Sequence, residues 1–93
     1  MVVDYDDWLE EQLKDPEFRA EYEALKVEEA LVQSMIEVRK SVGLTQAELA
    51  AKSGVKQSDL VKLENGQTEP TLSLLLQLAH GMGRRVSLSF EPA

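Results

Sequence analysis

Polar and small side chains at helical spacing, in the stretch from Lys56 to Asn65, are of the kinds that contact nucleic acid. Residues three and four apart share one face of a helix, and this face carries Gln57, Ser58, Val61, Lys62 and Asn65. A glutamine amide can pair with both N6 and N7 of adenine, and a valine can pack on the methyl group of thymine. Lys62 and Asn65 suit phosphates, and Ser58 suits a base or a phosphate. The pattern predicts a helix that reads bases, with Gln57 as its most specific reader.

The residues before this helix predict another short helix that positions it. Thr45 and Glu48, three residues apart, form the pattern of a capping box. Gly54 should end this helix. Two short helices joined by a glycine-containing turn make a helix-turn-helix unit. The second helix of such a unit enters the major groove of DNA. Gln46 in the first turn can donate to a phosphate and brace Gln57. An ordinary helical hairpin with a polar surface is the alternative, but the capping box, glycine turn and Asn-Gly stop together favour DNA binding.

The rest of the chain predicts further helices. Apolar residues at helical spacing predict one over residues 5–13, and Asp15-Pro16 predicts the start of a short second helix. A longer amphipathic helix is expected over residues 28–42. Thr71 can cap a last helix, which Gly83 should end.

The C-terminal residues predict a single strand. Val86, Leu88 and Phe90 alternate with serines, which is the pattern of a half-buried strand. A lone strand leaves its backbone donors and acceptors unpaired, and burying them in that state is costly. Pairing with the same strand of a second copy across a two-fold axis solves this problem. We therefore interpret residues 84–93 as a dimerisation element.

The negative charge is concentrated in the N-terminal third. The chain has 17 acidic and 10 basic residues, a formal net charge of -7. Residues 1–33 hold eleven acids and three bases, whereas residues 34–93 hold six acids and seven bases. Four of the five aromatic residues also lie in the acidic third. Large apolar side chains on acidic helices either pack against the main domain or bind a partner, and a solvated helix face is the plainer alternative.

Other features exclude several classes of protein. The chain has no cysteine, and we find no metal-ligand cluster, nucleophile motif or phosphate-binding loop, so neither an enzyme nor a cofactor is expected. His80, the single histidine, lies in a leucine-rich segment and suits packing or the surface better than catalysis. The longest apolar run, Leu74 to Leu76, cannot cross a membrane. Without a visible signal peptide, a cytoplasmic protein is the simplest expectation.

The segment GLTQAELAAKSGVKQSDLVKLENG resembles the helix-turn-helix of the Xre and lambdoid phage repressor family, and the resemblance covers residues 31–83. It implies a compact helical domain that binds a palindromic operator as a dimer. Arg39 and Glu64 match an ion pair of that family that joins the first helix to the end of the recognition helix. The implied DNA-contact residues are Thr45, Gln46, Gln57, Ser58, Lys62 and Asn65.

Two residues depart from the family pattern. Lys56 stands where a serine or threonine cap is usual, so the cap is lost but a cation is gained near the phosphates. Asp59 lies at about the third position of the recognition helix, where an acid suits the helix dipole. It can also repel phosphate or accept from a cytosine amino group, but we favour the dipole interpretation.

The flanks resemble those of HigBA-type antitoxins, through YDDWLEEQLKDPEFRAEYEAL before the helix-turn-helix and the strand after it. This resemblance implies a cognate partner toxin, a small basic ribonuclease of the RelE or HigB class. It implies that the acidic arm binds the toxin, and a basic partner is complementary in charge. The implied toxin-binding residues are Tyr5, Trp8, Leu9, Leu13, Phe18 and Tyr22.

Together these features predict an all-α fold. We expect a compact helical bundle containing a helix-turn-helix, with an N-terminal helical arm and one C-terminal β-strand that pairs across a homodimer. The expected division is an arm over residues 1–27, a DNA-binding domain over 28–83 and a dimerisation strand over 84–93. The predicted function is an antitoxin that neutralises its toxin and represses its own operon. A stand-alone phage-type repressor is the alternative, and a protein-interaction module without DNA binding also stays open.

Overall fold

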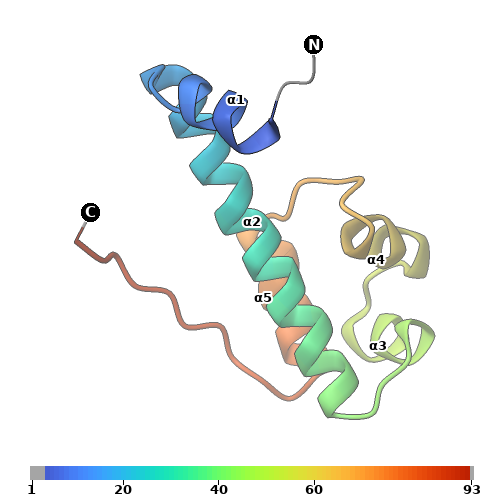
Figure 1. Ribbon diagram of the computed structural model, residues 1–93. Coiled ribbons are helices and arrows are strands. Elements are labelled where there is room, and N and C mark those ends of the chain that lie inside the picture. Colours follow the sequence, from blue (N-terminus) through green and yellow to red (C-terminus); the bar gives the residue numbers. More distant parts are fainter. Residues whose placement is uncertain (1–3, 93) are drawn as a thin grey trace.

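The computed structural model describes residues 4–92, which form five α-helices (Figure 1). These residues contain no β-strand, so the predicted all-α class is confirmed. Within this part of the chain every helix is too short or too polar to span a lipid bilayer. The helices are α1 (Tyr5–Gln12), α2 (Pro16–Ser41), α3 (Gln46–Ser53), α4 (Gln57–Glu64) and α5 (Leu72–Gly81).

Side-chain caps fix where most of the helices begin. The carboxylate of Asp4 accepts a hydrogen bond from the backbone N–H of Asp6 at 2.8 Å, and α1 starts between them. Asp15 caps α2 in the same way, with Pro16 at the first helical position. The hydroxyl of Thr71 accepts from the N–H of Leu74 at 3.1 Å and caps α5. Each cap satisfies a backbone donor that the first helical turn leaves without a partner.

Helix α2 is a single helix of 26 residues, so our expectation of two separate helices in this region is wrong. No glycine or proline occurs between Glu17 and Ser41, and the segment is rich in glutamate and alanine, which favour helix. Two apolar stripes suggested two elements, but they are parts of one helix in different surroundings. The division that we predicted between residues 27 and 28 falls inside α2, and the arm therefore joins the bundle through continuous helix (Figure 1).

The core lies between α3, α4, α5 and the C-terminal half of α2. Four leucines are fully buried there, and burial of each side chain stabilises the fold by about 2 kcal/mol. Helix α3 contacts both α4 and α5, whereas α2 reaches the core through Met35 and Arg39. The fully buried leucines are Leu49, Leu60, Leu63 and Leu78.

Residues 84–92 run as an extended chain without regular secondary structure (Figure 1). Val86 is half-buried near α2 and α5, whereas Leu88 is exposed and Phe90 is fully exposed. A strand needs a hydrogen-bonded neighbour, and residues 4–92 of a single copy supply none here. Pairing across a two-fold axis therefore stays a prediction. Residues 1–3 and 93 of the predicted arm and strand lie outside the described residues.

Candidate nucleic-acid interface

Helices α3 and α4 are joined by the turn that the sequence predicts. The hydroxyl of Thr45 accepts from the N–H of Glu48 at 3.1 Å, and the Glu48 carboxylate accepts from the N–H of Thr45 at 3.0 Å. This reciprocal capping box lowers the pKa of the Glu48 carboxyl, because the backbone hydrogen bond favours its charged form. Gly54 ends α3 with φ of 76°, a left-handed conformation that glycine adopts without steric cost. The capping box thus fixes where α3 begins, and Gly54 ends α3 and starts the turn into α4.

Helix α4 presents the predicted polar face to solvent. Leu60 and Leu63 are fully buried and hold the helix on the core, while Val61 is half-buried at the edge of the opposite face. Gln46 is half-buried at the start of α3. The other predicted DNA-contact residues are all exposed: Thr45, Lys56, Gln57, Ser58, Lys62 and Asn65.

The start of α4 departs from an ordinary capped helix. Lys56 occupies the N-cap position but makes no capping hydrogen bond with its side chain. Asp59 lies in the first turn, where its negative charge suits the helix dipole. The uncapped backbone donors at this end, together with the Lys56 ammonium group, are suited to binding an anion such as a phosphate.

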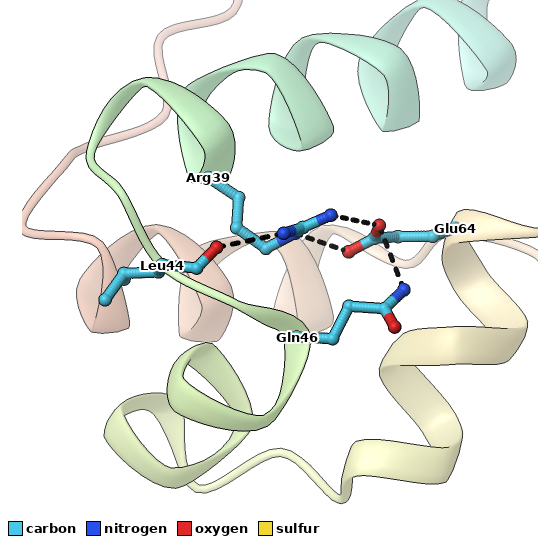
Figure 2. Close-up of polar contacts among 4 residues, drawn as sticks. All are labelled: Arg39, Leu44, Gln46 and Glu64. Carbon is cyan, nitrogen blue, oxygen red and sulfur yellow. Dashed lines mark hydrogen bonds and ion pairs between the residues drawn. The ribbon is translucent and has the colours of Figure 1, made fainter.

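A buried ion pair holds the end of α4 against α2 (Figure 2). Nε and Nη2 of Arg39 donate to the two carboxylate oxygens of Glu64 at 2.9 and 2.8 Å. The side chains of Arg39 and Glu64 are only 10% and 6% exposed. Nη1 of Arg39 donates to the backbone carbonyl of Leu44 at 2.9 Å, which adds the connection between α2 and α3 to the network. The structure thus brings together the two residues that the family resemblance pairs.

Gln46 belongs to the same network, through a contact that the sequence does not predict. Its amide donates to Oε1 of Glu64 at 3.2 Å, so the structure places it on Glu64 where we expected it to brace Gln57 (Figure 2). The two residues are 18 positions apart, and no local pattern in the sequence links them. Gln46 therefore ties the first turn of α3 to the last residue of α4.

Helix α1 folds back on the start of α2 (Figure 1), and the predicted arm residues belong to these two helices and the turn between them. The rings of Tyr5, Trp8, Phe18 and Tyr22 follow one another with centroids 6.0, 6.1 and 6.4 Å apart. Leu9 and Leu13 are half-buried and line a hollow between the two helices. Tyr5 and Trp8 remain 65% and 43% exposed. We call this row of four rings the aromatic ladder. It belongs to α1 and the first turns of α2, and this end of α2 is the one farther from α3 (Figure 1).

Comparison with known proteins finds relatives that are named as transcriptional regulators and one that is named as an antitoxin. An uncharacterised HTH-type transcriptional regulator of Haemophilus influenzae is 39% identical over 59 residues, which cover 63% of this chain and 60% of the relative. A second, from Methanothermobacter thermautotrophicus, is 44% identical over 48 residues, which cover 52% of this chain and 70% of the relative. Antitoxin HigA1 of Mycobacterium tuberculosis is 32% identical over 77 residues, which cover 83% of this chain.

The chain spans only 52% of the length of that antitoxin, so the likeness does not extend over the whole relative. No solved structure is significantly similar to the chain. The family model described as helix-turn-helix matches residues 35–88, which are more than half of the chain and include α3, α4 and α5. This chain belongs to the helix-turn-helix family.

Proposed function

We propose that this chain is a transcription regulator that reads an operator with α4. The observation that carries the proposal is the exposed face of α4, which offers Gln57, Ser58 and Lys62 to solvent from a helix anchored at its far end by Glu64. The relatives named as HTH-type transcriptional regulators support it.

The acidity of the chain does not oppose this role. Glu48 accepts a hydrogen bond in the capping box and Glu64 is paired with Arg39, so both carboxylates have a structural partner within the chain. Lys56 and Lys62 are exposed on that face and can neutralise phosphates. Two cations give modest affinity, and binding through two copies on a palindrome would increase it. In our proposal, a homodimer formed through residues 84–93 sets the two α4 helices about 34 Å apart, one turn of DNA.

The arm supports a second role, as the toxin-binding part of an antitoxin. Its aromatic ladder is partly exposed and lies in the segment of the chain with the greatest excess of acidic residues. Aromatic residues are frequent energetic anchors of protein interfaces, and the negative charge would steer a basic partner. The relative named Antitoxin HigA1 is similar over most of this chain, which favours a small basic RelE/HigB-like ribonuclease toxin as that partner. We therefore propose an antitoxin that represses its own operon.

A stand-alone phage-type repressor is the second candidate. One contact in the aromatic ladder favours this candidate. Trp8 packs edge-on against Phe18, so part of its apolar surface is already covered within the chain. In such a protein the arm would be a self-contained helical hairpin. The exposed ring of Tyr5 would then have no binding role.

Binding to the promoter of the chain's own operon tests the regulatory role. We expect specific, salt-dependent binding, and Gln57→Ala should weaken it by roughly 1–3 kcal/mol because adenine loses its bidentate partner. Lys62→Ala should weaken specific and non-specific binding alike and reduce the salt slope by about one. Gln33→Ala, which removes the same amide from the exposed side of α2, is the matched control for Gln57→Ala. Equal operator affinity for Gln57→Ala and wild type would show that Gln57 does not contribute to base recognition.

Co-expression with the product of the neighbouring reading frame tests the antitoxin role. The wild-type chain should suppress the toxicity of that protein, and the double variant Tyr5→Ala/Trp8→Ala should lose suppression while keeping operator binding. Leu72→Ala/Leu76→Ala is the matched control, because those side chains are comparably exposed but lie on α5. If the arm variant protects cells as well as wild type does, the arm does not bind the toxin. A stand-alone repressor would bind the operator and give no protection at all.

A further inference from the structure

A groove of about 890 Å³ lies between α2 and the loop that follows α4. One wall is the stretch of α2 from Leu25 to Ile36, and the other is the loop over residues 65–70. The apolar side chains of Val32, Ile36 and Leu63 line its inner part. We call it the α2 groove. It begins one helical turn beyond Tyr22 and therefore continues the aromatic ladder along the same helix.

The rim of the α2 groove carries more negative than positive charge. Glu28 and Glu29 line it from α2, and Glu69 lines it from the loop. Lys26 is the single cation among the described residues that line the groove, and it already lies 3.7 Å from Glu29 and over the ring of Tyr22. The groove thus combines an apolar floor with a rim that carries more negative charge than the groove's own lysine can neutralise.

Glu28 and Glu69 line the α2 groove from its two walls. Desolvation on the groove wall raises the pKa of the Glu28 carboxyl, and the charge of Glu69 and a hydrogen bond with its side chain raise it further. Two like charges held close together disfavour each other's ionised form. A cationic side chain placed between them would remove that repulsion and form two charge-assisted hydrogen bonds.

We propose that the α2 groove is a second docking site for the basic partner that binds the arm. A lysine or arginine of the partner would lie between Glu28 and Glu69, and an apolar side chain beside it would cover Val32 and Ile36. Leu25, which is 52% exposed at the lip, would link this contact to the aromatic ladder. This inference rests on the proposed antitoxin function, and it adds a contact site on the DNA-binding bundle itself.

The test is calorimetric titration of the full-length chain with the product of the neighbouring reading frame. Glu28→Gln/Glu69→Gln should lower the affinity about tenfold and reduce its salt dependence, because the cation loses its charged partners. Leu25→Ser should also weaken binding. Glu37→Gln removes one charge from the exposed side of α2 outside the groove, and Val27→Ser changes a 60% exposed apolar residue outside the groove. Both controls should stay within about twofold of wild type.

The folded state should tolerate the charge variants, since Glu28→Gln relieves a repulsion, and equal thermal unfolding would show this. If the wild-type chain does not bind the neighbouring protein, both the proposed function and the docking site fail. If Tyr5→Ala/Trp8→Ala abolishes binding but the groove variants match their controls, the docking site alone fails. If the groove variants weaken self-association and leave partner binding unchanged, the groove receives a second copy of this chain and the proposal is overturned.

Discussion

Arg39 in α2 and Glu64 at the end of α4 form a bidentate ion pair that is almost completely buried. The Glu64 carboxylate also accepts from Gln46 in α3, so one pair of charges joins three helices. Among the described residues, no buried side-chain nitrogen or oxygen lacks a hydrogen-bond partner. The pair therefore does more than neutralise two charges: it fixes the end of the helix whose outer face is proposed to read DNA.

Glu64→Ala should destabilise the fold by about 3–5 kcal/mol, because it leaves a buried guanidinium without its counter-charge. The double variant Arg39→Met/Glu64→Leu should recover most of this loss, since apolar residues of similar volume often replace a buried pair without cost. Urea denaturation measures both effects. Glu23→Ala, which breaks the exposed pair between Arg19 and Glu23, is the control and should cost less than about 1 kcal/mol. Similar losses for Glu64→Ala and Glu23→Ala would show that burial of the pair is irrelevant.

Gly81→Ala should destabilise the fold, although alanine normally favours a helix over glycine by up to about 1 kcal/mol. Helix α5 meets the end of α3 at this glycine. A Cβ atom there would lie 2.7 Å from Cβ of Ser53 and 3.0 Å from its Cα and backbone nitrogen. Backbone atoms cannot rotate away, so we expect a loss of about 1–3 kcal/mol from overpacking. Thermal unfolding tests this, with Ser73→Ala on the exposed side of α5 as control. A rise in melting temperature for Gly81→Ala would contradict the close approach.

The features that the sequence predicts correctly involve residues close together in the chain. Thr45 and Glu48 lie three residues apart, and the capping box that they predict is present. Thr71 caps α5 as expected, because its hydroxyl needs to reach only Leu74. Such interactions depend on residues within one helical turn, and reading them requires no knowledge of the tertiary fold.

Other features depend on surroundings that no short window contains. The aromatic stripe of Phe18 and Tyr22 and the aliphatic stripe around Met35 suggested two helices, because they face different neighbours along one continuous α2. The bond from Gln46 to Glu64 joins residues 18 positions apart, and it depends on how α3 packs against α4. A strand around Leu88 would require hydrogen bonds to a partner, which a single chain does not offer within its described residues.

The stabilisation by Glu48 should depend on pH. Its pKa is lowered in the folded state by the N–H of Thr45, so its charged form stabilises the fold above the unfolded pKa of about 4.3. That contribution is lost as the pH falls through the lower, folded pKa. Glu48→Ala should therefore be less stable than wild type near pH 7, and the difference should shrink toward pH 3. Urea midpoints across this range measure it, with exposed Glu37→Ala as control. A difference that stays constant with pH would mean that the carboxylate does not contribute through its charge.

Phe90 provides the sharpest test of dimerisation through the C-terminal segment. Its ring is fully exposed in the single chain, and Leu88 on the same face of the predicted strand is 59% exposed. Burial of one such side chain is worth about 2 kcal/mol, and a two-fold interface counts each substitution twice. Phe90→Ser should therefore raise the dimer dissociation constant by more than about tenfold, which sedimentation equilibrium can measure. Ser89→Ala alters the opposite face of the strand and should leave the constant unchanged. Unchanged association in Phe90→Ser, with normal folding, would place the interface elsewhere and remove residues 84–93 from it.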